Sequence, residues 1–285
     1  MQLRRACRVV LLNAFERMTV TKNWKYYLYP ALLVSALPCQ ALAAGFEQER
    51  GAVIGFDPSE ILGGDAAFSG SLPAKGRYVL VDAREARLFM VEDGRVSDSM
   101  RVIVGKPNSA TPTMRSTLQT ATLNPYWNVP TDLAQTIIAP RVVKQGSAYL
   151  RKNHYKIVSG FTPDATEVSP ELIDWPAVAA GRSIIYVRQL PGRSNSMGKI
   201  KFGFTGSDGI FLHDTPDKKL FASSNRNLSN GCVRLEDAPR LARWLFGTAP
   251  ATASVEPEQT ISMPAAVPIV ITYSKPSKPI ELASR

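Results

Sequence analysis

Residues 213–235 read HDTPDKKLFASSNRNLSNGCVRL, which places a histidine and a cysteine on either side of a short polar spacer. His213 ends an alternating apolar segment, and Cys232 follows directly after Gly231. A thiol attacks a carbonyl only as the thiolate, and with an ordinary pKa near 8.5 only about 3% is ionised at pH 7. A nearby imidazole can take the proton, giving the thiolate–imidazolium pair of cysteine acyl transfer. The pattern predicts Cys232 as nucleophile and His213 as base.

Few other residues can take these roles. Of the three cysteines, Cys7 and Cys39 lie in an N-terminal leader, and of the two histidines, His154 lies in a segment expected to be helical and solvated. A lone thiol in an exported chain is either buried and inert or retained for chemistry. Inert burial of Cys232 and a purely structural His213 therefore stand as the alternatives to a catalytic pair.

The residues around Cys232 suit an acyl-transfer site. Gly231 permits a tight turn and a close approach of the substrate. The backbone N–H groups of this segment, which includes Ser229 and Asn230, are expected to bind an oxyanion. Arg234 is expected to bind a substrate carboxylate, with an ordinary surface arginine as the alternative.

The first 44 residues are typical of an export signal. A basic stretch (18–25) precedes an apolar run (28–37), and Ala41-Leu42-Ala43 gives the small-x-small pattern of a cleavage site. An uncleaved membrane anchor is the alternative, although the run is short for a span. Removing the leader, which carries +5, from a chain of net charge +10 leaves about +5. That mild excess suits an anionic cell-wall surface and does not argue for nucleic acid.

The rest of the chain is expected to be mainly β. Residues 45–74 are expected to be a linker, residues 75–274 the catalytic domain with a helical insertion at about 131–182, and residues 275–285 a tail. Alternating patterns and turn residues predict strands at Arg77–Ala83, Arg87–Glu92, Arg95–Gly105, Arg115–Leu123, Ser183–Arg188, Lys199–Thr205, Gly209–His213 and Ala265–Tyr273. Apolar residues at i, i+3, i+4, i+7 and i+8 predict a helix over Glu236–Phe246.

The chain resembles the L,D-transpeptidases with a YkuD-type catalytic domain over roughly residues 75–273. Their signature is a histidine, a spacer of fewer than twenty residues, and Ser/Thr-x-Gly-Cys followed by an apolar residue and arginine. Asn124–Pro130 (NPYWNVP) is similar to the family's Asn-Pro-x-Trp-x-x-Pro segment, and Gln189–Phe202 to the stretch before the catalytic histidine in the larger, Gram-negative-type members. Asn230 stands where many members have a second histidine.

The resemblance implies a β-sandwich catalytic domain with a helical lid at about 131–182. The peptidoglycan-binding module of many relatives is expected to be absent, because residues 45–72 are too few for it. Trp127 is expected to contribute a substrate platform, with core packing as the alternative. The backbone carbonyl of Asp214 is expected to orient His213, which would make the Asp214 carboxylate dispensable.

The implied reaction is acyl transfer on peptidoglycan. Cys232 would attack the bond between the diamino acid and the terminal D-Ala of a tetrapeptide stem, and an amine of another stem would take the acyl group, giving a 3→3 cross-link. Water or an envelope protein as acceptor, and a non-catalytic wall-binding module, are the alternatives. No metal or organic cofactor is expected, the location is expected to be the periplasm or cell envelope, the protein is expected to be a monomer, and carbapenems are expected to acylate Cys232.

Overall fold

The structure is a computed structural model that describes residues 73–206, 209–248 and 256–273. All of these belong to one compact unit spanning residues 51–285. The expected leader, the linker up to residue 72 and the tail lie outside the described residues. Within the described part of the chain, no helix combines the length and the apolar character needed to cross a membrane.

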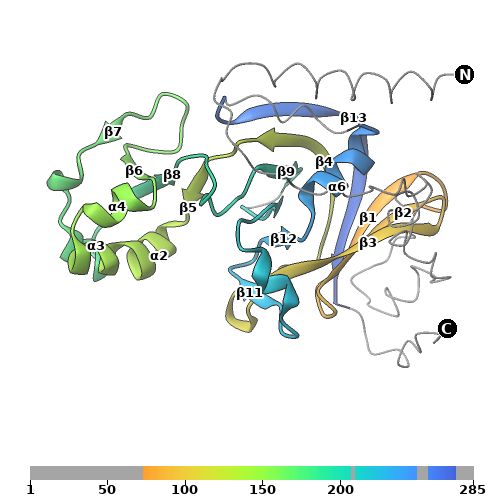
Figure 1. Cartoon of the computed structure of the whole chain (residues 1–285), viewed down its shortest axis with the longest axis horizontal. Coiled ribbons are helices and arrows are strands. Elements are labelled where there is room, and N and C mark those ends of the chain that lie inside the picture. The colour runs from red at the N-terminus through yellow and green to blue at the C-terminus, as the bar shows by residue number, and fades with distance from the viewer. Residues whose placement is uncertain (1–72, 207–208, 249–255, 274–285) are drawn as a thin grey trace, which may run out of the picture. The chain divides into compact units, whose positions relative to one another are not determined.

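Nine strands form the main sheet, in the order β11-β3-β12-β10-β9-β4-β13-β1-β2. The sheet closes on itself because β3 also pairs with β2 through its first half, while its second half pairs with β12 and β11. Figure 1 shows the long β3 and β13 that run through this sheet. The strands are β1 Arg77–Asp82, β2 Arg87–Glu92, β3 Arg95–Gly105, β4 Met114–Leu123, β9 Ile200–Phe204, β10 Leu212–His213, β11 Asn227–Ser229, β12 Val233–Leu235 and β13 Gln259–Thr272.

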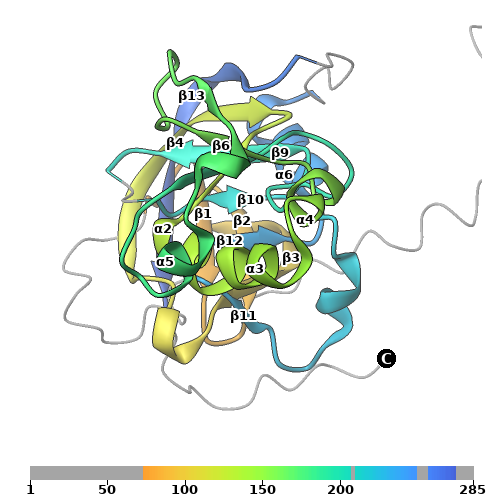
Figure 2. The same cartoon turned by 90° about the vertical axis from the view of Figure 1, so that its left-hand side faces the viewer.

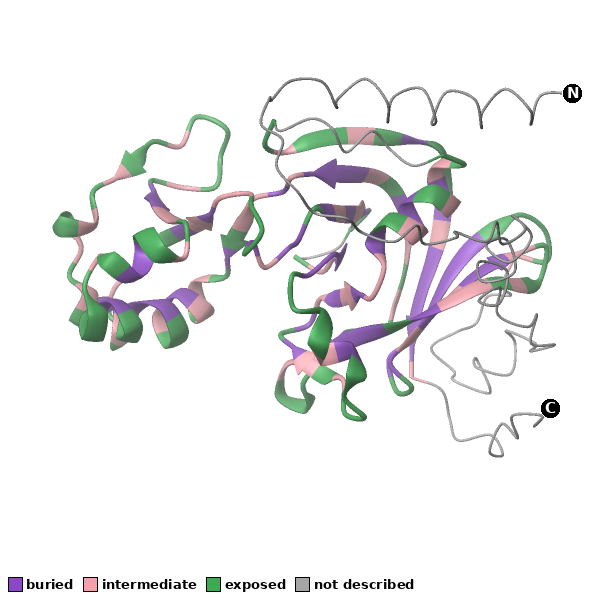
Figure 3. Ribbon diagram, viewed as in Figure 1, coloured by how far each residue is buried: buried purple, intermediate pink, exposed green. Residues whose placement is uncertain are grey.

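The core of the main sheet comes from one face of nearly every strand. Alternate residues of a strand point to opposite faces, so an alternating apolar pattern buries one of them. Figure 3 shows the buried segments along these strands. Large side chains that are fully buried in this core include Leu88, Met90, Leu118, Ile200 and Phe202.

Helix α6 (Ala238–Phe246) follows the last strand of the Cys232 segment and packs on the same core through Leu241 and Leu245. It begins two residues later than the sequence pattern predicted. The reason is that Asp237 caps it, with its carboxylate accepting a hydrogen bond from the Arg240 N–H at 2.9 Å. The helix ends at Gly247, whose φ of +75° suits a left-handed cap.

A second group of elements between β4 and β9 has its own core. It contains the four-stranded sheet β5-β8-β6-β7 and several short helices, which are seen together in Figure 1 and Figure 2. We call residues 127–189 the lid. Its elements are β5 Trp127–Val129, α2 Thr131–Leu133, the π-helical turn η3 Ala134–Ile138, α3 Ala139–Gln145, α4 Ala148–Lys152, β6 Tyr155–Val158, β7 Glu167–Val168, η4 Pro170–Leu172, α5 Trp175–Ala179 and β8 Tyr186–Gln189.

The mainly β class with additional helices, predicted from the sequence, is confirmed. Two local expectations are corrected. The segment at 131–182 is not purely helical, because the Tyr-Lys-Ile-Val sequence at Tyr155–Val158 favours a strand that pairs with β8. Strand β10 is shorter than Gly209–His213, since Gly209 adopts a φ of +82° that extended chain does not allow. The remaining elements, η2 Pro107–Ser109 and η5 Lys218–Ala222, are short 3₁₀ turns in connections.

Candidate active site

The parallel pairing of β10 and β12 brings the two halves of the His213–Cys232 motif together. His213 lies opposite Arg234, and the Val233 N–H donates to the Phe211 carbonyl at 2.9 Å. Directly paired residues share a face of the sheet, and so do residues two apart on one strand. The side chains of His213 and Arg234 therefore lie on the same face of adjacent strands. Cys232 directly precedes β12 and is close enough to Arg234 to feel its charge.

The same row continues across the sheet to β9. His213 also pairs with Lys201, and Lys201 pairs with Thr122 of β4. The Lys201 ammonium lies 3.6 Å from a Glu258 carboxylate oxygen and 5.3 Å from the centre of the Phe211 ring. His213 is thus flanked by one cation on each neighbouring strand. The sequence did not indicate Lys201, because only strand register places it beside the histidine.

The orientation of the imidazole is fixed by the backbone. His213 Nδ1 lies 2.5 Å from the carbonyl oxygen of Asp214. A carbonyl can only accept, so Nδ1 carries the proton and Nε2 presents its lone pair. This is the tautomer that a general base needs, with Nε2 as the accepting atom.

The carboxylate of Asp214 has a separate structural task. It accepts hydrogen bonds from the Lys199 N–H at 2.9 Å and from Lys218 Nζ at 2.7 Å. Lys218 also donates to the carbonyls of Leu235 and Glu236 at the end of β12. The carboxylate therefore ties three segments around the site together, a role that the sequence did not suggest.

The surroundings of His213 and Cys232 favour the uncharged form of both side chains before substrate binds. Burial, followed by the nearby Arg234 cation, lowers the pKa of His213 to about 4. Burial raises the pKa of the Cys232 thiol, although a backbone hydrogen bond from Phe211 and the charge of Arg234 partly offset this. The thiol also donates to the Gly209 carbonyl at 3.5 Å. The arrangement therefore favours a resting thiol and a neutral imidazole over the expected ion pair, so the proton would move during attack.

The turn before Cys232 is held by short hydrogen bonds. The Ser229 hydroxyl donates to the Cys232 carbonyl at 2.6 Å and accepts from the Gly231 N–H at 3.2 Å. Gly231 has a φ of +112°, a conformation that side chains other than hydrogen rarely allow. Asn230 is exposed and accepts from Lys106 Nζ at 3.4 Å. Ser229 is a bracing residue of the turn, and Asn230 lies at its surface.

Arg234 and Trp127 lie in different surroundings. Arg234 is half-buried beside Cys232, and burial lowers the pKa of its guanidinium. Trp127 packs with the lid core, where its ring centre lies 6.3 Å from that of Tyr155. The structure therefore places Arg234 with the thiol and Trp127 with the lid core. His154 is exposed in the lid, immediately before β6.

The Asn124–Pro130 segment connects β4 to the lid. The Tyr126 N–H donates to a carboxylate oxygen of Glu258 at 2.5 Å, and the Asn124 carbonyl accepts from the Glu258 N–H at 3.0 Å. Since Glu258 also pairs with Lys201, this segment is linked to the row that contains His213. No group of three or more His, Cys, Asp and Glu side chains within the described ranges is placed to hold a metal ion.

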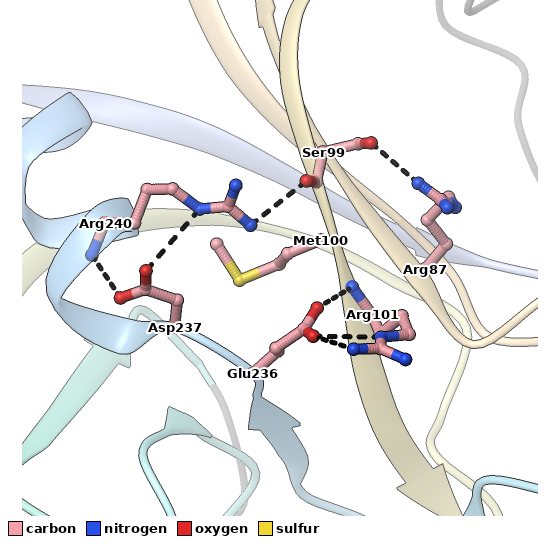
Figure 4. Close-up of a pocket in the computed structure, with 7 residues that line it drawn as sticks. All are labelled: Arg87, Ser99, Met100, Arg101, Glu236, Asp237 and Arg240. Carbon is pink, nitrogen blue, oxygen red and sulfur yellow. Dashed lines mark hydrogen bonds and ion pairs between the residues drawn. The ribbon is translucent and has the colours of Figure 1, made fainter. Parts of the chain in front are cut away.

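A separate open pocket lies where β2 and β3 meet the start of α6, and its residues are drawn in Figure 4. Its arginines are already paired. Arg101 binds Glu236, Arg87 donates to the Ser99 hydroxyl, and Arg240 donates to the Ser99 carbonyl. The Arg240 contact joins α6 to β3, the Arg101 contact joins β3 to the residues just before α6, and the Arg87 contact joins β2 to β3. The pocket includes neither Cys232 nor His213.

Comparison with known proteins assigns the family. The model of the L,D-transpeptidase catalytic domain (YkuD) matches residues 76–260, a range that contains the whole row around His213 and Cys232. The chain belongs to the family of L,D-transpeptidase catalytic domains. A Haemophilus influenzae protein named "Putative L,D-transpeptidase" is 36% identical over 168 residues, which are 59% of this chain and 33% of the relative. The chain thus spans about a third of the length of that relative.

Solved structures give weaker matches. An L,D-transpeptidase from Mycobacterium smegmatis is 16% identical with a TM-score of 0.31, and the match covers 69% of this chain and 58% of that one. L,D-transpeptidase 3 from Mycobacterium tuberculosis, in complex with a faropenem-derived adduct, is 11% identical with a TM-score of 0.33, covering 69% and 60%. An L,D-transpeptidase from Xylanimonas cellulosilytica is 14% identical with a TM-score of 0.29, covering 71% and 63%.

Proposed function

We propose that the protein is a peptidoglycan L,D-transpeptidase that uses Cys232 as its nucleophile and His213 as its general base. The observation that carries this proposal is the parallel pairing of β10 with β12 inside the family region, which sets His213 opposite Arg234, the residue two positions after Cys232. The tautomer of His213 supports it, because Nε2 is the atom left free to accept the thiol proton.

In the first half-reaction, Sγ of Cys232 bonds to the carbonyl carbon of the diamino acid residue in a tetrapeptide stem. The thiol proton moves to Nε2 of His213, and the carbonyl electron pair becomes an oxyanion. When the oxyanion collapses, the C–N bond to D-Ala breaks and the imidazolium returns its proton to the leaving amine. The products of this step are free D-Ala and a thioester on Cys232.

In the second half-reaction, the side-chain amine of another stem attacks the thioester. His213 takes a proton from that amine and gives it to the departing sulfur, so the enzyme returns to its starting state. The product is a 3→3 cross-link. Arg234, which lies beside the thiol, is suited to bind a carboxylate of the stem, because a guanidinium can form two parallel hydrogen bonds with a carboxylate.

The setting proposed for this reaction is the periplasm or cell envelope. The basic stretch, apolar run and small-x-small pattern of residues 1–44 support export. The partners would be donor and acceptor stem peptides.

The test is incubation of purified protein with disaccharide-tetrapeptide, followed by mass spectrometry of the products. Wild type should release D-Ala and form a 3→3 dimer, and Cys232→Ala should lower the rate by about 10⁴-fold or more, since the nucleophile is lost. Dimer formation by Cys232→Ala at the wild-type rate would exclude the proposal. Release of D-Ala without a dimer would identify water as the acceptor instead.

A carbapenem gives an independent test of the nucleophile. Intact-mass spectrometry should show one adduct on the wild type and none on Cys232→Ala. Two glutamine variants test the role of the histidine. His213→Gln should slow adduct formation by about 10²- to 10⁴-fold, because the proposed base is lost. The control His154→Gln, at an exposed lid position, should be acylated at the wild-type rate. An adduct that survives Cys232→Ala would place the nucleophile elsewhere.

A further inference from the structure

Thr111 is a buried residue that joins the β3–β4 connection to the turn before Cys232. It is 1% exposed, and its hydroxyl donates to the Gly231 carbonyl at 2.8 Å while accepting from the Gly105 N–H at 2.9 Å. Its own carbonyl accepts the Tyr273 hydroxyl at 2.8 Å. Both the side chain and the backbone of Thr111 are therefore held in place.

The bond to Gly231 fixes the direction of the next amide. The described chain has no cis peptide bonds, so the Gly231 C=O and the Cys232 N–H point in opposite directions from one planar peptide. With the carbonyl held on Thr111, the Cys232 N–H is directed to the opposite side of that peptide. The preceding amide, that of Gly231, already donates to the Ser229 hydroxyl.

The chain around Thr111 is shaped for this contact. A side chain at Gly105 would place its Cβ 2.1 Å from the Ser109 carbonyl oxygen and 2.6 Å from the Thr111 nitrogen, so only glycine fits. Gly105 pairs with Ser229 of β11, which is the residue that braces the Cys232 turn from its other side. The connection can therefore fold back tightly onto the Gly231 carbonyl.

We propose that Thr111 is a positioning residue for the oxyanion. Building on the proposed function, its hydroxyl holds the Gly231–Cys232 peptide so that the Cys232 N–H donates to the oxyanion that forms when Sγ adds to the substrate carbonyl. The N–H of a nucleophilic residue is a common donor in such sites, and a preorganised donor stabilises the transition state more than the ground state. Thr111 acts through Cys232 and does not touch the reacting atoms.

The test compares two reactions of the same thiol. Acylation by a carbapenem passes through a tetrahedral oxyanion, whereas alkylation by iodoacetamide displaces iodide and forms none. Thr111→Val keeps the shape of the side chain but removes the hydroxyl. It should lower the second-order acylation rate by about 10²-fold and leave the alkylation rate within about threefold of wild type. Thr111→Ser restores the hydroxyl and should recover acylation to within about threefold of wild type.

Two outcomes would overturn the proposal. One is an unchanged acylation rate in Thr111→Val. The other is an equal fall in the acylation and alkylation rates, because a residue with a purely structural role would slow both reactions. If Thr111→Val does not fold, Tyr273→Phe replaces it, because the tyrosine hydroxyl donates to the Thr111 carbonyl and so helps to hold Thr111 in place. It should slow acylation several-fold without changing alkylation, and unchanged acylation would again overturn the idea. A wild type that no carbapenem acylates would instead reject the proposed function itself.

Discussion

At the scale of single residues, the proposed chemistry depends on how burial shifts the pKa values of His213 and Cys232. His213 is 4% exposed, and one of its ring nitrogens is committed to the Asp214 carbonyl. Burial penalises the charged form of the ring, and Arg234 and Lys201 on the neighbouring strands oppose the same charge. The residue is therefore kept neutral, which a base that must accept a proton requires.

Because His213 is neutral when buried, the folded protein should lose stability in acid. The His213 pKa is about 4 in the folded protein, against about 6.5 for an unperturbed histidine. Between these values the unfolded chain binds a proton that the folded chain does not. The free energy of unfolding should therefore fall as the pH drops from 6.5 to 4, by up to about 3 kcal/mol from this residue. Urea unfolding at pH 7 and pH 4.5 measures the effect.

The controls for this prediction are the two glutamine variants. His213→Gln should lose less stability than wild type over that pH range, because it has no buried ring to protonate. His154→Gln removes an exposed histidine and should retain the wild-type pH dependence. If His213→Gln loses as much stability in acid as wild type, the buried neutral imidazole is not the cause.

At the scale of elements, the site depends on how the turns between strands are packed. The turn before β9 presses Gly198 against Asp214, the residue that follows β10. Gly198 has a φ of +64°, and an added Cβ would lie 2.4 Å from Asp214 Oδ2. Asp214 also contacts His213 through its carbonyl, so Gly198 packs against the residue that orients the proposed base.

Gly198→Ala should therefore affect both stability and activity. The left-handed backbone conformation should lower the free energy of unfolding by about 1–2 kcal/mol, because alanine tolerates it less well than glycine. Overpacking of the new methyl group against Asp214 should lower it by about 1–3 kcal/mol more. Carbapenem acylation should slow as well, because Asp214 must shift. Urea unfolding and the acylation rate are the measurements.

Gly181 offers a matched control in the lid. Its φ is +72°, but an added Cβ would meet nothing within 4 Å. Gly181→Ala should lower the free energy of unfolding only through its left-handed backbone conformation, and it should be acylated at the wild-type rate. Equal destabilisation of the two variants, with unchanged acylation in Gly198→Ala, would show that Asp214 tolerates the side chain.

At the scale of the whole described unit, apolar side chains form two large clusters. The first fills the closed nine-stranded sheet and extends under α6, and the second lies within the lid between α3, α5 and the β5-β8-β6-β7 sheet. Elements that bury separate cores often open as separate cooperative units. We therefore expect the lid to lose its structure at a lower free energy than the main sheet.

Ile138→Ala tests this separation. Ile138 is 1% exposed in the lid core, and its truncation should cost about 2–5 kcal/mol. Amide hydrogen exchange should accelerate within residues 127–189 and remain slow in β4, β9 and β13. Leu118→Ala, in the main core, is the control and should accelerate exchange in those strands. Uniform acceleration in both variants would mean that the two clusters unfold together.

Much of this could be predicted from local sequence. Alternating patterns located most strands to within a residue or two, because a strand that buries one face repeats every two residues. The His213 and Cys232 candidates came from residue chemistry and the motif around them. The helix after Cys232 was predicted two residues too early, since its acidic start turned out to contain the cap. Of the lid strands, β8 was anticipated by the strand predicted at Ser183–Arg188, whereas β5, β6 and β7 were missed because they are too short to show a clear period.

By itself the sequence determined which residues are candidates for the proposed chemistry: one thiol among the described residues, one histidine in strand context, and a glycine that permits the turn between Ser229 and Cys232. Only the tertiary structure decided what surrounds them. Strand register set Lys201 and Arg234 on either side of His213, and chain closure brought Thr111 onto the Gly231 carbonyl from the β3–β4 connection. The physical reason is that burial, pairing and hydrogen-bond direction depend on residues far apart in the chain, whereas a motif records only neighbours.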